Sequence, residues 1–169
     1  PNEVILALAD RQDLTLGGVP MTLTSDGLRA SALVAANTDL DLTRFTVEVG
    51  QMRADSSAGT VFSLSNALVA LRAAKDAPLL YAAFADINDL ALPVSLRQIL
   101  DPAGNFPAIL SQMTIDASIT TDRKLDRNVI SDLRRPQIDA FKLNGMTLAW
   151  GPLSLRGKGE VTIDRAGLP

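Results

Sequence analysis

The sequence predicts a mainly β fold: long antiparallel strands in a twisted, curled sheet, shaped as an open groove or half-barrel, with two short helices. Apolar and polar residues alternate with a period of two along most of the chain, as at Phe45, Val47 and Val49. Turn-forming residues such as Gly17 and Gly18 separate these stretches. One apolar and one polar face per strand is typical of an antiparallel sheet with one side exposed to water.

Alternation marks the strands in order along the chain. It covers residues 14–16, 21–23, 28–34, 45–49, 62–64, 115–119, 146–150, 153–155 and 161–163. Glycines predict hairpin turns at residues 17–18 and 157–159, and residues 25–27 end a strand. Residues 67–75 fit two structures, because their apolar positions alternate as in a strand while their Ala and Leu content suits a helix.

Two segments depart from the alternation. Residues 93–100 have apolar side chains at helical spacing, and Pro93 suits the first turn of a helix. Residues 126–133 form the second predicted helix, with Asp126 as its N-cap and Pro136 beyond its end. Both helices are short, so they cannot cover the apolar face of many strands.

Composition excludes several classes of function. A net charge of -3 argues against nucleic-acid binding, which requires a basic face. The chain has no Cys and no His, which excludes thiol nucleophiles, disulfides, Cys/His zinc sites and Ser-His-Asp triads. We therefore expect no cofactor, no metal and no enzymatic activity.

The acidic pairs are the remaining candidates for chemistry. Asp39 and Asp41 are spaced to share one face of a strand, where a solvated strand edge explains them better than a catalytic dyad. Asp86 and Asp89 have the oxygen ligands of a calcium loop but lack its central Gly and distal Glu. Residues 101–104 are typical of a turn that ends a helix.

The ends of the chain suggest a part of a longer protein. It begins at Pro1 without a methionine and ends where a further strand is due. The length of 169 residues suits one domain with a core of its own. We expect residues 1–169 to be a single β-rich domain from a longer, membrane-anchored protein.

The aliphatic strand surface is the main functional candidate. A sheet with one apolar face must cover it with helices, with another sheet or with a ligand. Composition by itself favours a closed core, as in a sandwich, but a curled sheet would instead form a groove for acyl chains. The predicted lipid-facing residues are Phe45, Val47, Val49, Leu64, Ile115, Ile119, Leu148, Trp150, Leu153 and Leu155.

Several stretches carry a family resemblance. They are LTLGG at 14–18, LTSDGLRA at 23–30, LDPAG at 100–104, LAWGPLSL at 148–155 and the dipeptide AG at 166–167. The chain resembles an uncharacterised bacterial envelope family, the domain of unknown function twenty-one twenty-five, which is loosely similar to AsmA-like proteins. The resemblance implies a β-rich periplasmic body, an inner-membrane anchor outside this chain, and a hydrophobic groove linked to lipid movement. It implies no functional residues.

These observations lead to two functional hypotheses. The first is a non-enzymatic periplasmic module that binds or conducts lipid along an aliphatic sheet face. The alternative is a structural or protein-interaction module of the cell envelope with no small-molecule ligand. The expected partners are lipid acyl chains or an envelope protein, with no nucleic acid, and contact with the membrane only through the anchor.

Overall fold

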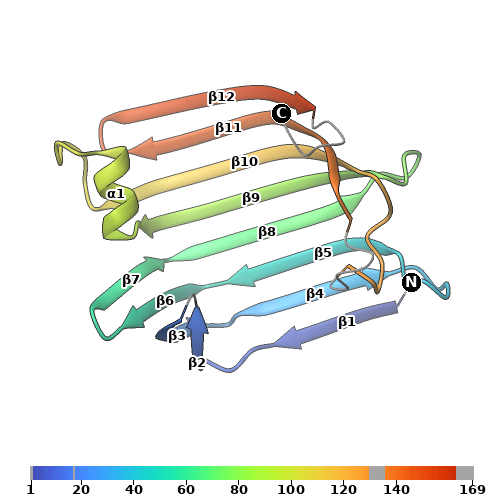
Figure 1. Cartoon of the computed structure of the whole chain (residues 1–169), viewed down its shortest axis with the longest axis horizontal. Coiled ribbons are helices and arrows are strands. Elements are labelled where there is room, and N and C mark those ends of the chain that lie inside the picture. The colour runs from blue at the N-terminus through green and yellow to red at the C-terminus, as the bar shows by residue number, and fades with distance from the viewer. Residues whose placement is uncertain (1, 17, 130–135, 163–169) are drawn as a thin grey trace.

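The computed structural model describes residues 2–16, 18–129 and 136–162, which form one large antiparallel sheet and one short helix (Figure 1). The strands are β1 (Asn2–Ala7), β2 (Arg11–Leu16), β3 (Val19–Asp26), β4 (Arg29–Val34), β5 (Leu42–Val49), β6 (Gln51–Ser56), β7 (Gly59–Leu64), β8 (Asn66–Ala73), β9 (Leu80–Ala91), β10 (Ile109–Thr121), β11 (Ile138–Trp150) and β12 (Leu153–Thr162). The helix is α1 (Val94–Leu100). The prediction of a mainly β, antiparallel fold is confirmed.

The main body of the sheet has the order β1-β4-β5-β8-β9-β10-β11-β12. In the described part of the chain, β1 pairs only with β4 and β12 only with β11, so the sheet is open at both edges. The other four strands each adjoin one strand of the main body along the chain, across a bend. These neighbouring pairs are β1 with β2, β3 with β4, β5 with β6, and β7 with β8. Single residues make two of these bends: the Gly50 N–H donates to the Asp26 carbonyl, and the Ser65 N–H donates to the Asn88 carbonyl.

One sequence prediction needs correction, one is confirmed, and one ambiguity is resolved. The predicted turn at residues 157–159 is wrong, because β12 continues through both glycines and pairs with β11 there. The predicted strand end at residues 25–27 is confirmed, because β3 ends at Asp26 and β4, which pairs with different neighbours, begins at Arg29. The ambiguous segment 67–75 is a strand for most of its length.

Only one of the two predicted helices is found in the described residues. The helix at 93–100 is confirmed as α1. Of the second, at 126–133, the described part is a single turn, in which the Asp126 carboxylate accepts the Asn128 N–H at 2.7 Å. That bond is the capping contact expected of Asp126, but the Val129 N–H bonds the Asp126 carbonyl in a tighter turn than an α-helix makes. Residues 130–133 lie outside the described residues.

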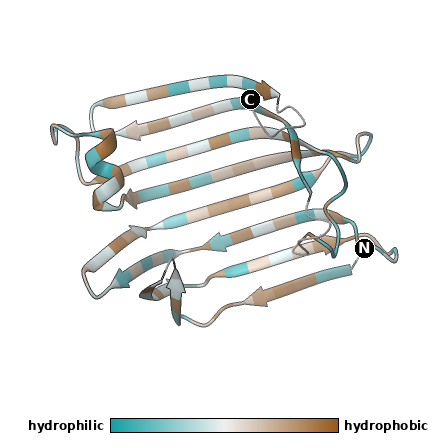
Figure 2. Ribbon diagram, viewed as in Figure 1, coloured by the Kyte–Doolittle hydropathy of each residue, from teal (hydrophilic) through white to brown (hydrophobic). Residues whose placement is uncertain are grey.

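The register separates an apolar from a polar side of the main body. Residues paired directly across antiparallel strands point to the same side. One continuous row across the strands is Leu6, Ala30, Val47, Val69, Ala85, Ile115, Met146 and Gly157. The next row, on the opposite side, is Ala7, Arg29, Glu48, Leu68, Asp86, Thr114, Thr147 and Arg156. We call these sides the aliphatic face and the polar face; Figure 2 shows the alternation as brown and teal bands.

Candidate functional site

One end of the aliphatic face is covered by the connection between β9 and β10. Trp150, at the end of β11, is buried beneath this connection. Its indole Nε1–H donates to the Pro107 carbonyl at 2.7 Å, and its ring stacks on Phe106 with centroids 4.9 Å apart. A buried indole that keeps its hydrogen bond anchors two segments distant in sequence. These residues form one wall of the site.

Asp101 fixes the backbone of this wall through its side-chain carboxylate. Its carboxylate is buried and accepts the backbone N–H groups of Asn105 at 2.9 Å and Phe106 at 2.8 Å. Two N–H donors satisfy the charge that would otherwise be costly to bury. The predicted helix-ending turn at 101–104 is therefore confirmed, and it places Phe106 against Trp150.

The opposite end of the aliphatic face is crossed by residues 122–129, which we call the strap (Figure 1). Tyr81 of β9 is buried under it, and its hydroxyl accepts the Leu125 N–H at 2.8 Å. The Leu42 N–H donates to the Leu125 carbonyl at 2.7 Å, and the Arg127 N–H donates to the Asp39 carbonyl at 3.1 Å. The strap therefore leaves β10, passes over the strands between, and reaches the loop before β5.

An ion pair also fixes the strap. Lys124 Nζ lies 2.6 Å from the Asp41 carboxylate, which also accepts the Asn37 side-chain amide. Asp41 lies in the loop that ends just before β5, and not on a strand as its spacing from Asp39 predicted. The hydrogen bond from Lys124 lowers the pKa of Asp41, and the bond to Asp41 raises the pKa of Lys124. Both shifts favour the charged pair in the folded protein.

Removing this ion pair has a predictable pH dependence. The lowered pKa of Asp41 gives stability that is present above its ordinary value of 3.8 and is lost as the pH falls through the folded value. We expect Lys124→Met to have a slightly lower Tm than the parent at pH 7, and the difference to shrink below pH 3.8. Thermal melts at pH 7 and at acid pH measure this. Lys75→Met, at an exposed lysine with no ion pair to a described residue, is the control; equal effects of the two substitutions at pH 7 contradict the prediction.

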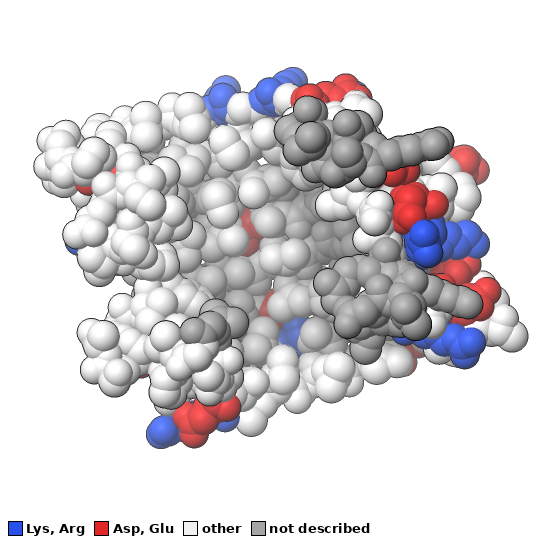
Figure 3. Space-filling view, in the orientation of Figure 1, with Lys and Arg blue, Asp and Glu red and all other residues white. Residues whose placement is uncertain are grey.

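Between the wall and the strap, the aliphatic face is not covered by other described elements. Val69 lies in the middle row of the sheet and is 41% exposed. Leu6 at the β1 edge and Leu155 at the β12 edge are also exposed on this face. Figure 3, which views this side, shows a hollow with few charged atoms beside the raised end of the molecule that carries α1 in Figure 1. This region is the candidate site.

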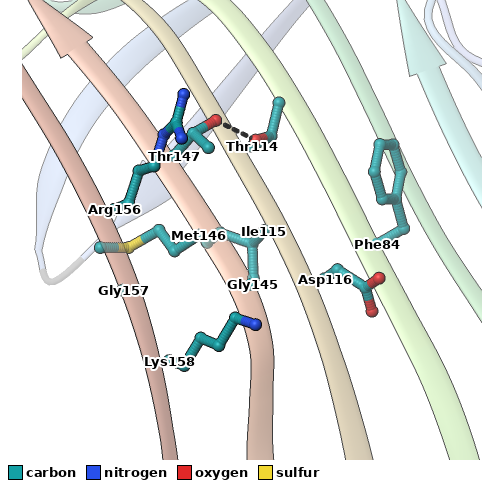
Figure 4. Close-up of a pocket in the computed structure, with 10 residues that line it drawn as sticks. All are labelled: Phe84, Thr114, Ile115, Asp116, Gly145, Met146, Thr147, Arg156, Gly157 and Lys158. Atoms are coloured by element: carbon teal, nitrogen blue, oxygen red, sulfur yellow. Dashed lines mark hydrogen bonds between the residues drawn. The ribbon is translucent and has the colours of Figure 1, made fainter.

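The polar face has a shallow depression with a different chemistry (Figure 4). It has a volume of about 370 Å³, and Gly145 leaves its centre without a side chain. Arg156 and Lys158 of β12 lie on one side of it, and Asp116 and Phe84 on the other. The Thr114 and Thr147 hydroxyls bond each other at its edge. This arrangement lacks a nucleophile held by a base, as acyl transfer would need.

Metal ligation has no support in the residues that the structure describes, because no cluster of three or more acidic residues forms there. Asp86 and Asp89, both on β9, are not joined into a calcium loop.

Comparison with known proteins places the chain in a family. The family described as "Uncharacterized protein conserved in bacteria (DUF2125)" matches residues 1–169. The chain belongs to DUF2125. No curated protein and no solved structure matches the chain. The DUF2125 resemblance seen in the turn and strand motifs is thereby confirmed.

In this DUF2125 chain, the predicted lipid-facing residues share the aliphatic face, with one exception. Leu64 lies on β7, beyond the bend, where it pairs with Met52. Val49 and Trp150 are on the aliphatic face but buried. The others on that face, in whole or partial contact with solvent, are Phe45, Val47, Ile115, Ile119, Leu148, Leu153 and Leu155.

Sequence reasoning missed other residues of this DUF2125 site. Val69, Ala85 and Met146 lie in the same row as Val47 and Ile115. The alternation of Ala67, Val69 and Leu71 was the available signal for β8. It was ambiguous because alanine and leucine also favour helices.

The described residues contain no helix that is long and apolar enough to span a membrane.

Proposed function

We propose that the aliphatic face of this DUF2125 chain is a groove that binds lipid acyl chains. The observation that carries the proposal is the row of uncharged residues that crosses the sheet from Leu6 to Gly157 without interruption. In the middle of this row, the side chain of Val69 is exposed to solvent. The wall at Trp150 and the strap over Tyr81 bound this row on either side. Each apolar side chain that a ligand covers contributes favourable burial energy.

The dimensions of the row suit an acyl chain. From β1 to β12 there are seven strand spacings of about 4.8 Å, or roughly 34 Å if the sheet were flat. A lipid acyl chain spans half of a bilayer core, or about 15 Å. The groove would therefore hold a whole chain along its length. It opens at both edges of the sheet, which favours a path for conducting lipid as well as a site for binding it.

The chemistry of the face supports binding without catalysis. The row contains no charged residue, so it has no group to activate water or to hold a phosphate. We propose a non-enzymatic module of the bacterial envelope, placed in the periplasm by an inner-membrane anchor outside this chain. Its location rests on the family resemblance, and its ligand class rests on the aliphatic face.

Two substitutions on adjacent strands test the groove. Val69 on β8 and Phe84 on β9 are 41% and 40% exposed, but they lie on opposite faces of the sheet. We expect Val69→Asp to weaken binding of a fluorescent fatty acid by at least about tenfold, because it puts a charge in the path of the chain. Phe84→Asp should bind as the parent does. Fluorescence titration gives the two Kd values, and circular dichroism checks the fold of each variant.

Lipid acquired in the cell gives a second readout. Protein purified from envelopes without detergent is extracted with organic solvent, and the extract is analysed by mass spectrometry. A stoichiometric lipid, absent from Val69→Asp and kept by Phe84→Asp, supports the groove. A clean extract from folded parent protein that also fails to bind the fatty acid refutes it.

The alternative function is a protein-interaction module, and the edge strand β1 is the feature that favours it. Every residue of β1 is exposed, and Val4, Ile5 and Leu6 follow one another in it. An exposed apolar edge strand offers unpaired N–H and C=O groups to another strand. If the fatty acid does not bind and a specific envelope protein is captured in a β1-dependent way, this alternative becomes the better one.

A further inference from the structure

The connection between β9 and β10 is much longer than the fold requires. Ala91 of β9 pairs directly with Ile109 of β10, and residues 92–108 lie between them. Two adjacent antiparallel strands need only a two-residue turn. Long connections in compact domains usually have a function of their own. The part after α1 supplies the wall over Trp150, which leaves α1 itself unexplained.

The apolar residues of α1 all face solvent. Val94, Leu96, Ile99 and Leu100 are exposed, and Ile99 is 75% exposed. Leu96, Ile99 and Leu100 lie on one face at helical spacing. No residue of α1 is buried, and the helix packs extensively against no other described element. Figure 2 shows α1 standing at one end of the strands.

Nothing in the described structure accounts for the stability of so short a helix. α1 has seven residues, and its N-cap is Pro93, which makes no side-chain capping hydrogen bond. Isolated helices of fewer than about 12 residues are marginal in water, and packing of an apolar face is what normally holds them. The apolar face of α1 therefore calls for a surface that the described residues do not provide.

The connection between β9 and β10 has no acidic side chain at its surface. Its charged residues are Arg97 and Asp101, and Asp101 is buried with its carboxylate bonded to two backbone N–H groups. The connection therefore has one half-buried cation, Arg97, and no exposed acid, although the whole chain has a net charge of -3. Such a surface complements anionic lipid headgroups.

We infer that α1 inserts into the surface of a lipid bilayer, with Leu96, Ile99 and Leu100 among the acyl chains and Arg97 at the headgroups. The area of the patch favours a bilayer over a protein partner. The three side chains of this face would bury roughly 180–360 Å², whereas a stable protein interface needs about 800 Å² per partner. An interfacial helix needs only to bury its apolar side at the boundary of headgroups and chains.

This contact goes beyond binding of an acyl chain in the groove and does not depend on it. It would hold the wall of the aliphatic face, and with it the open middle of the sheet, against a membrane. The same connection carries both α1 and the residues that pack on Trp150.

The absence of native cysteines allows a site-specific test. Ile99→Cys and the control Ile5→Cys are labelled with a polarity-sensitive fluorophore and mixed with vesicles of phosphatidylglycerol and phosphatidylcholine. Ile5 is a matched control because it is 66% exposed, also apolar, and far from α1 on the edge strand β1. We expect a blue shift for the label at position 99 and none at position 5.

Flotation of the full chain with the same vesicles gives the second readout. We expect Ile99→Asp combined with Leu100→Asp to reduce the vesicle-bound fraction about tenfold or more. Ile5→Asp should float as the parent does, and Arg97→Gln should lose the preference for phosphatidylglycerol. The α1 double variant should keep the affinity for fatty acid, so a failure of membrane binding and a failure of the groove are told apart.

Three outcomes overturn the inference. The first is parent protein that stays at the bottom of the gradient. The second is a loss of flotation in Ile5→Asp equal to that of the α1 double variant. Concentration-dependent self-association in sedimentation, abolished by Ile99→Asp with Leu100→Asp, would assign the α1 face to a second copy of the chain instead.

Discussion

Trp150→Ala is expected to lower the free energy of unfolding by about 3–5 kcal/mol, as loss of a buried aromatic side chain does. Trp150 is 5% exposed, so the substitution leaves a cavity that solvent does not fill. It also removes the stacking partner of Phe106 and the donor to the Pro107 carbonyl. For a chain of this size the Tm should fall by on the order of 10 °C, measured by thermal melts and urea denaturation.

Trp150→Phe is the control for that prediction. It keeps an aromatic ring for Phe106 to stack on and loses the Nε1–H donor and part of the buried area. We expect a clearly smaller loss of stability than for alanine. An alanine variant within about 1 kcal/mol of the parent, or one no worse than phenylalanine, would show that the wall is not held by this indole.

Gly151→Ala is the second large effect, with an expected loss of about 2–4 kcal/mol. Gly151 has φ +55°, a left-handed conformation that an alanine adopts at a cost. A Cβ at this position would lie 2.7 Å from Pro107 Cδ and 3.0 Å from Pro107 Cγ. The substitution therefore both strains the turn between β11 and β12 and pushes the wall off Trp150. Urea denaturation measures the loss.

Gly104→Ala separates the two causes. Gly104 has φ +69°, but a Cβ there meets no atom within 4 Å, so only the backbone cost of about 1 kcal/mol remains. Adding Pro107→Ala to Gly151→Ala removes the clashing ring and should recover part of the stability, in a double-mutant cycle. If Gly104→Ala and Gly151→Ala cost the same and the cycle shows no coupling, close contact with Pro107 is not the cause.

Local alternation predicted the strands well because a side chain in a strand reports its face regardless of which strand lies beside it. Phe45, Val47 and Val49 alternate, and β5 places all of them on the aliphatic face. Pro93 and the apolar spacing after it likewise predicted α1 from local sequence. The same method failed at residues 157–159, where glycines suggested a turn. Pairing of Gly157 and Gly159 with β11 keeps the backbone extended.

Long-range pairing decided what local sequence could not. Leu64 alternates like the predicted face residues, but the bend at Ser65 moves it to a strand paired with β6. The strap contains Asp126, which suggested a helix. Tertiary hydrogen bonds to Tyr81, Leu42 and Asp39 instead tie this segment across the sheet. Such contacts join residues far apart in sequence, so no local pattern encodes them.

The sequence by itself determined that this chain is built of strands with one aliphatic and one polar side, and that it belongs to DUF2125. Side-chain polarity is a property of each residue, and the period of two assigns it to a face. Only the tertiary structure decided which strands are neighbours, that the sheet stays open at β1 and β12, and that a wall and a strap stand at the two ends of the aliphatic face. Those features arise from hydrogen bonds and packing between distant residues, which depend on how the whole chain folds back on itself.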